Sequence, residues 1–251
     1  MRKSSHRREE FASAVHVSTE AEAAAVAEAM PGLPLVTVPN GFDTAGVENG
    51  SGAAAFRDRF VGGHEGPLVL FLGRITFKKG LDLLVEAFSM VIREVPEARL
   101  AIVGPDDEAL QPSLELQARR LGASAHVDFV GPLYGPDRLA ALAAATTWVL
   151  PSHTENFGSA AVEAMAAGVP IIVSPEVNLA TEIARAQAGL VVPRTPGALR
   201  DAIVGLLRDP ARRGRLAAGG RTLARRFDWS VVGPQLADAY RFAAERGSSY
   251  S

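Results

Sequence analysis

Short apolar runs alternate with longer amphipathic runs through most of the chain. The short runs are rich in Leu, Ile and Val, as buried strands are, whereas the longer runs repeat apolar residues at helical spacing. Regular alternation of the two is typical of a parallel sheet covered by helices. The predicted strands are 68–72, 99–103, 127–130, 148–150, 171–173 and 190–192. The predicted helices are 81–93, 108–121, 137–145, 160–167, 179–186 and 198–207. The fold class is therefore α/β, with a Rossmann-like parallel sheet and helices on both faces.

The two ends of the chain predict less structure than this central region. Near the start, strands at 15–17 and 35–38 enclose an Ala- and Glu-rich helix at 20–30, and 48–66 is a Gly-rich loop with one short helix around Phe56. Near the end, two further helices follow, and the first is so rich in Arg that it is interpreted as a solvated helix face. The chain accordingly divides into segments 1–38, 39–66, 67–228 and 229–251.

Composition and charge exclude several classes of protein. The 251 residues are 47% hydrophobic, which is enough for a sizeable core, and 26 Lys and Arg against 28 Asp and Glu leave a net charge of −2. No basic field is therefore present to hold a nucleic acid, and no stretch is apolar enough to cross a bilayer. The absence of cysteine excludes disulfides and Cys-based metal sites. The N-terminus lacks the apolar run of a signal peptide, so the cytoplasm is the expected location.

Ligands of open parallel sheets bind at the carboxyl ends of the strands, so the loops that follow strands are the candidate sites. The loop after strand 68–72 contains Gly73, Arg74 and Lys79, and Lys78 and Lys79 are two of only three lysines in the chain. A guanidinium, an ammonium and a helix N-terminus together suit a diphosphate. The alternative interpretation is that Arg74 and Lys79 merely cap and solvate the turn.

The loop after strand 148–150 carries two carboxylates, Glu155 and Glu163, on either side of a Phe-Gly turn. Carboxylates repel phosphate but accept hydrogen bonds from hydroxyl groups. Two cations and two separated carboxylates therefore fit a ligand with a diphosphate in the middle and hydroxyls on both sides, such as a nucleotide-sugar. For Glu163 the alternative is a partner for the helix dipole.

Two other groups of residues suggest chemistry that the sequence does not favour. Ser152 and His153 are adjacent, but no nucleophile-elbow pattern surrounds the serine, so a hydrolase is disfavoured. Asp106, Asp107 and Glu108 cannot all face one ion from the start of a helix, so helix capping is the favoured account of these acids. We therefore expect no metal and no cofactor, and the nucleotide-diphosphate-sugar is expected as a substrate.

Several segments together carry a family resemblance. They are Gly73-Arg74, Lys79-Gly80-Leu81, Val103-Gly104-Pro105, Phe129-Val130-Gly131, Glu155-Asn156-Phe157-Gly158 and the run from Glu163 to Pro170. These segments resemble the donor-binding, C-terminal half of retaining GT-B glycosyltransferases of glycosyltransferase family four. The resemblance extends from Val36 to about Tyr240, and its most specific part is the pair of glutamates separated by seven residues.

The resemblance implies a role for each matching residue. Arg74 and Lys79 would hold the donor diphosphate and stabilise the leaving group, Glu155 would lie beside the transferred sugar, and Glu163 would bind the ribose hydroxyls. The other donor-binding residues that it implies are Gly73, then Gly131, Pro132 and Leu133 around the base, and the backbone of Asn156, Phe157 and Gly158 at sugar or phosphate oxygens.

The resemblance also implies a domain organisation. Residues 1–38 would be a remnant of an N-terminal Rossmann domain, 39–66 a linker and variable loop, 67–228 the nucleotide-sugar-binding domain, and 229–251 a crossover helix and tail. The acceptor-binding domain of the family would then be largely missing, which leaves the apolar stripe of the last helix exposed. This stripe comprises Val232, Leu236, Tyr240 and Ala243. Expected partners are the donor, an unidentified acceptor, and either a chain that carries the missing domain or a second copy of this chain.

The sequence thus predicts transfer of a sugar from a nucleotide-diphosphate-sugar to an acceptor with retention of anomeric configuration, and this chain supplies the donor-binding half. The alternative is a noncatalytic nucleotide-sugar-binding or regulatory module that works with a partner chain. A dinucleotide-binding protein is disfavoured, because no Gly-x-Gly-x-x-Gly motif follows any predicted strand.

Overall fold

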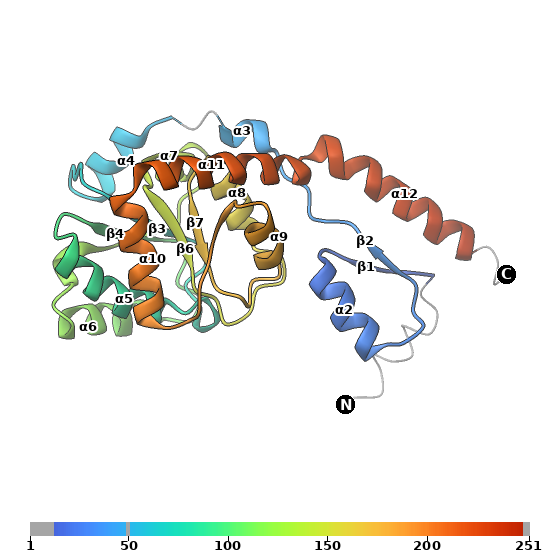
Figure 1. Cartoon of the computed structure of the whole chain (residues 1–251), viewed down its shortest axis with the longest axis horizontal. Coiled ribbons are helices and arrows are strands. Elements are labelled where there is room, and N and C mark those ends of the chain that lie inside the picture. Colours follow the sequence, from blue (N-terminus) through green and yellow to red (C-terminus); the bar gives the residue numbers. More distant parts are fainter. Residues whose placement is uncertain (1–12, 49–50, 248–251) are drawn as a thin grey trace. The chain divides into compact units, whose positions relative to one another are not determined.

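The computed structural model describes residues 13–48 and 51–247, which belong to two compact units (Figure 1). The larger unit spans residues 43–225. The smaller unit combines the chain up to Phe42 with the chain from Arg226 onward. Residues 43–66, predicted as a linker and variable loop, are therefore part of the larger unit.

A six-stranded parallel sheet forms the centre of the larger unit, with strand order β5-β4-β3-β6-β7-β8. The strands are β3 (Leu68–Leu72), β4 (Arg99–Val103), β5 (Val127–Gly131), β6 (Thr147–Leu150), β7 (Ile171–Val173) and β8 (Gly189–Val191). Every residue of β3, β6 and β7 is buried, as expected where helices cover both faces of a sheet. The predicted Rossmann-like α/β fold is confirmed, and no strand differs from its prediction by more than one residue at either end.

The direction in which strands are added reverses at β3. From β3 the chain moves outward through β4 to β5, and it then returns to the other side of β3 to form β6. In open parallel sheets a crevice forms at such a reversal, because the loops after the two central strands leave in opposite directions. The loops 73–80 and 151–158 flank this point in the sheet.

Helices fill the connections between the strands of the larger unit. They are α3 (Thr44–Glu48), α4 (Ala53–Phe60), α5 (Leu81–Glu94), α6 (Gln111–Arg120), α7 (Gly135–Ala144), α8 (Ser159–Ala166), α9 (Ala180–Arg185), α10 (Pro196–Arg208) and α11 (Pro210–Ala224). Helix α5 packs against α6 and α10, α4 packs against α7, and α8 packs against α3 and α11. Within the described ranges, no helix has the length and hydropathy that a membrane span requires.

Two α-helices differ from the prediction by more than two residues at one end or were not predicted at all. Helix α6 begins three residues later than expected, because the Asp106 carboxylate accepts hydrogen bonds from the N–H groups of Leu110 and Gln111 at 2.8 and 2.9 Å. This side-chain cap confirms that the acidic loop caps a helix, but it places the start of that helix at Gln111. Helix α3 was not predicted, since its five residues are too few for an apolar repeat to show.

The smaller unit contains a two-stranded parallel sheet, β1 (Val15–Val17) and β2 (Leu35–Thr37), with α2 (Glu20–Ala29) between the strands in sequence. The hydroxyl of Thr19 accepts from the N–H of Glu22 at 3.1 Å, and the Glu22 carboxylate accepts from the N–H of Ser18 at 2.7 Å. These reciprocal bonds satisfy two amide groups at the start of α2, which explains why the helix begins there.

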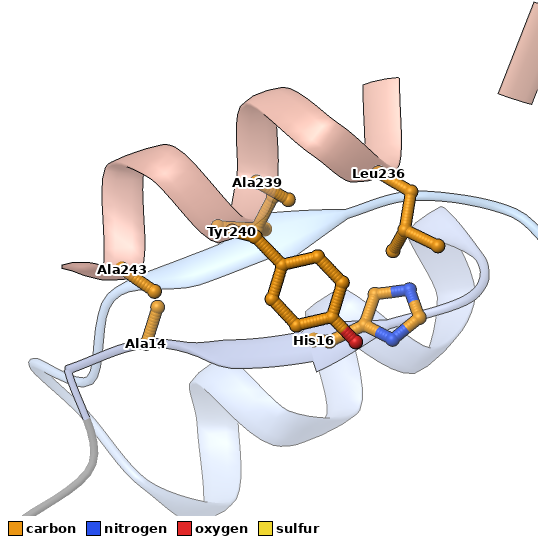
Figure 2. A pocket seen from close by; sticks show the side chains of 7 residues that line it. Ala14, His16, Leu236, Ala239, Tyr240 and Ala243 are labelled. Atoms are coloured by element: carbon orange, nitrogen blue, oxygen red, sulfur yellow. The ribbon is translucent and has the colours of Figure 1, made fainter. Parts of the chain in front are cut away.

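The last helix, α12 (Trp229–Gly247), carries the predicted apolar stripe in the smaller unit. Side chains of α12 reach toward the strand of His16 and leave a cavity of about 120 Å³ (Figure 2). The cavity is lined by Ala14, His16, Val36, Leu236, Ala239, Tyr240 and Ala243. The expectation that the whole stripe is exposed is wrong at Val232, which is 1% exposed, and holds at Tyr240, which is 70% exposed.

Two glycines of the larger unit let the loops at the carboxyl end of the sheet approach one another. Gly104 has a φ of +146°, and a Cβ atom there would lie 1.9 Å from the carbonyl oxygen of Gly73. Gly80 has a φ of +65°, and a Cβ atom there would lie 2.3 Å from the carbonyl oxygen of Pro151. The loops after β3, β4 and β6 can therefore contact one another only because neither position has a side chain.

We predict that Gly104→Ala lowers the free energy of unfolding by about 2–6 kcal/mol, because a strained backbone and an overpacked contact each cost roughly 1–3 kcal/mol. Urea unfolding followed by circular dichroism measures this difference. Gly122→Ala is the matched control: Gly122 also has a positive φ, +72°, but a Cβ atom there would meet nothing within 4 Å. Equal losses in the two variants would contradict the crowding argument.

Candidate functional site

The loops after β3, β4 and β5 are held together by backbone hydrogen bonds at the carboxyl end of the sheet. The N–H of Gly73 donates to the carbonyl of Val103, and the N–H of Gly104 donates to the carbonyl of Gly131, both at 2.9 Å. The loop after β6 joins them, because the N–H of His153 donates to the carbonyl of Lys78 at 2.7 Å. The loops singled out in the sequence thus form one continuous rim.

A pocket of about 190 Å³ opens beside this rim. Its lining residues are Leu72, Gly73, Arg74, Gly104, Pro105, Pro132, Leu133, Tyr134, Arg138 and Ala160. The structure therefore brings together four predicted site residues that are up to 60 positions apart: Gly73, Arg74, Pro132 and Leu133. Gly131, the last residue of β5, has a φ of +80° and turns the chain into the pocket wall.

Lys79 and Glu155 form an ion pair across the two central loops. Their side chains are only 14% and 18% exposed. The backbone fixes both residues, since the N–H of Lys79 donates to the carbonyl of Thr76 at 3.0 Å and the N–H of Glu155 donates to the carbonyl of Glu176 at 3.2 Å. Lys79, which is predicted to bind the diphosphate, is thus in direct contact with Glu155, which is predicted to lie beside the sugar.

Arg74 reaches outward from the same rim. Its guanidinium lies 3.5 Å from the Asp107 carboxylate, in a pair whose side chains are 63% and 42% exposed. Glu108 accepts a hydrogen bond from the N–H of Phe77 at 2.7 Å. The three consecutive acids therefore have separate partners, and in the described part of the chain no three His, Asp or Glu side chains gather as metal ligands do.

Glu163 lies in the second turn of α8 and forms an ion pair with Arg138, which lies in the first turn of α7. Burial lowers the pKa of the Arg138 guanidinium. Sequence reasoning missed Arg138, although one signal was available. A cation in the first turn of a helix opposes the helix dipole, so its presence there calls for a separate reason.

The N-terminus of α8 provides backbone donors at the same edge of the sheet. Gly158, with a φ of +80°, is the N-cap and no side chain caps the helix. Phe157 is buried and anchors the turn, whereas Asn156 is exposed. The first amide groups of a helix have no partner within it, and together with the dipole they attract an anion.

Ser152 and His153 do not form a catalytic pair. Ser152 is fully buried and its hydroxyl donates to the carbonyl of Lys78 at 2.9 Å. The His153 ring stacks on Phe77, with ring centroids 5.0 Å apart, and its Nδ1 atom lies 2.6 Å from a guanidinium nitrogen of Arg194. Sequence reasoning missed Phe77 and Arg194, which contact His153 in the loop that carries Glu155.

Comparison with known proteins identifies relatives of the chain. Residues 54–223 match the family described as Glycosyl transferases group 1. The phosphatidyl-myo-inositol mannosyltransferase of Mycobacterium leprae is 33% identical over 220 residues, which cover 86% of this chain and 56% of that protein. The D-inositol 3-phosphate glycosyltransferase of Frankia alni is 38% identical over 187 residues, which cover 71% and 46% respectively. The chain thus spans about half the length of these curated relatives.

Solved structures agree on the fold. The structure of Anabaena Alr3699/HepE in complex with UDP and glucose superposes with a TM-score of 0.84 at 24% sequence identity, and the match covers 94% of this chain and 65% of that one. The structural likeness establishes the fold, and the sequence match over more than half of the chain establishes the family. The chain therefore belongs to the family of group 1 glycosyl transferases and has the Rossmann-like α/β domain of GT-B enzymes.

Proposed function

We propose that this chain supplies the donor-binding half of a retaining glycosyltransferase that uses a nucleotide-diphosphate-sugar. The observation that carries the proposal is the position of the Lys79–Glu155 pair at the reversal of strand order, where Rossmann-like sheets bind their ligands. A cation for phosphate and an acceptor for sugar hydroxyls are needed side by side at the bond that breaks.

The surrounding residues support a placement for each part of the donor. The base lies in the pocket against the wall formed by Pro132 and Leu133. Glu163 accepts hydrogen bonds from the ribose hydroxyls. The diphosphate lies between Lys79, Arg74 and the N-terminus of α8, with Gly73 close enough for backbone contact. The sugar lies against Glu155 and the backbone at residues 156–158. This order follows the donor from one end to the other along a single rim.

The chemical contribution of the chain is stabilisation of the leaving group. When the bond between the anomeric carbon and the diphosphate oxygen breaks, negative charge develops on the diphosphate, and the Lys79 ammonium and Arg74 guanidinium neutralise it. The acceptor oxygen then bonds to the anomeric carbon on the face that the diphosphate leaves, and its proton passes to the departing phosphate. No covalent intermediate with the protein is needed, and the configuration is retained.

The acceptor-binding part of the proposed catalytic unit is not among the residues assigned above. The relatives are about twice as long as the matched region, so we assign the complete transfer reaction to this chain together with an acceptor-binding domain. A noncatalytic module that binds a nucleotide-sugar for a partner chain is the second candidate. A transfer assay separates the two, because only the first candidate transfers sugar once an acceptor-binding domain is supplied.

Nucleoside diphosphate binding is expected to be insensitive to EDTA, because two cations and a helix N-terminus neutralise the diphosphate without a metal. Isothermal titration of UDP and GDP with and without EDTA measures this. A requirement for magnesium or manganese would contradict the proposed arrangement.

Lys79→Ala is expected to weaken UDP or GDP binding about 10- to 150-fold, which corresponds to the roughly 1.5–3 kcal/mol of a charge-assisted hydrogen bond. Binding of the bare nucleoside is expected to stay unchanged. The neighbouring Lys78→Ala is the matched control, since Lys78 is exposed and adjacent in sequence. Equal losses for nucleoside and nucleoside diphosphate would show that the Lys79 ammonium does not touch phosphate.

Glu155→Gln is expected to leave UDP and GDP binding no weaker than in the wild type, because the substitution releases Lys79 from its ion pair. The same variant should bind UDP-glucose or GDP-mannose more weakly, since this residue is assigned to the sugar. Titration with all four compounds tests both expectations. Loss of nucleoside diphosphate affinity alone would mean that the assignments of Glu155 and Glu163 are reversed.

A further inference from the structure

In the larger unit, the ion pair between Arg138 and Glu163 differs from an exposed surface pair because its carboxylate is mostly buried. The Glu163 side chain is 14% exposed, and its Oε2 atom is shielded from solvent. In the described ranges that oxygen has no recorded partner except the Arg138 guanidinium. One residue earlier on α7, Asp137 pairs with Arg59 at 3.2 Å, but those side chains are 52% and 67% exposed. Exposed pairs of that kind contribute little, whereas a buried carboxylate without its cation is costly.

Arg138 occupies a position that has an energetic cost. It is in the first turn of α7, where the helix dipole disfavours a cation, and burial lowers its pKa. Arg138 also lines the pocket beside Leu133 and Arg74. The Arg138 side chain is 37% exposed and therefore only partly desolvated, and the Glu163 carboxylate is the charged group that pairs with it.

The pair has a geometric consequence for Glu163. A carboxylate has two acceptor oxygens and rotates freely about its last bond unless something holds it. The Arg138 guanidinium occupies Oε2, which leaves Oε1 as the oxygen that can accept from a ligand. A guanidinium is planar and its donors are fixed relative to one another, so it orients a carboxylate better than an ammonium does.

We propose that Arg138 is a positioning residue that holds the Glu163 carboxylate in place for the ribose hydroxyls of the nucleotide. This inference rests on the proposed function, because it takes the ribose to be the ligand of Glu163. Arg138 then determines how strongly the site distinguishes a ribonucleotide from a nucleotide without these hydroxyls. The preference for ribonucleotides depends on one oriented acceptor, the Glu163 carboxylate. The preference disappears when that carboxylate is free to rotate.

The test compares UDP and GDP with their 2′,3′-dideoxy forms and with inorganic diphosphate by isothermal titration. In the wild type, the dideoxy forms should bind about tenfold more weakly or worse, as expected for loss of a charge-assisted hydrogen bond. In Arg138→Ala this ratio should fall toward one, while inorganic diphosphate binding stays unchanged and reports an intact loop. Arg138→Lys, which keeps the charge without the planar fork, should restore part of the ratio.

Two further variants isolate the pair. Glu163→Gln should lose the same discrimination, and adding Arg138→Ala to it should cause no further loss, since both substitutions disable one unit. Arg59→Ala is the matched control, because it breaks the exposed ion pair with Asp137, the neighbour of Arg138 on α7. Its ratio of dideoxy to ribonucleotide binding should equal that of the wild type. Where Arg138→Ala does not fold, Arg138→Lys and the double variant with Glu163→Gln carry the test.

The outcomes separate this inference from the proposed function. A wild type that binds neither nucleotide overturns the proposed function. A wild type that distinguishes the dideoxy forms, together with an Arg138→Ala variant that distinguishes them equally well, overturns only the role of Arg138. A wild type that binds both forms equally overturns the placement of the ribose at Glu163, and the positioning role with it.

Discussion

The parallel pairing of β3 with β6 is the constraint on which the site depends. Parallel strands place all their carboxyl ends at one edge, and the reversal of strand order at this pair places the loops after β3 and β6 beside each other where such sheets bind ligands. Lys79 and Glu155 are 76 positions apart in the chain, and this pairing brings them into contact. A register shift of even one residue would move the loop of Glu155 along the sheet and separate the pair, because each residue advances a strand by about 3.3 Å.

Glycines make the contact between the loops possible. The positions of Gly80 and Gly104 would place a side chain against the backbone of a neighbouring loop, so the loops approach to backbone contact only without one. Lys79 and Glu155, which these loops carry, are mostly buried, and a buried charge is stable only when it is paired.

Three carboxylates hold three cations around the rim: Asp107 with Arg74, Glu155 with Lys79, and Glu163 with Arg138. Each cation or carboxylate that we assign to the donor therefore already has a partner on the protein. In the proposed function, donor binding exchanges these partners: phosphate replaces a carboxylate beside Lys79 and Arg74, and a ribose hydroxyl donates to the Glu163 oxygen that Arg138 leaves open. Such an exchange lowers the net gain from each contact, but it keeps the side chains oriented before the ligand arrives.

The sequence by itself determined the elements, because apolar periodicity and Gly and Pro punctuation are local properties of the chain. The strands of the larger unit and the loops that carry Arg74, Lys79 and Glu155 were therefore predictable. The family followed from motifs within single loops, such as the two glutamates around Phe157-Gly158. Only the tertiary structure decided how charges pair, since the partners come from different elements and local patterns contain no information about them. Arg138 is the clearest example: in sequence it is one arginine among many, and its ion pair with Glu163 joins α7 to α8, two helices from different parts of the chain.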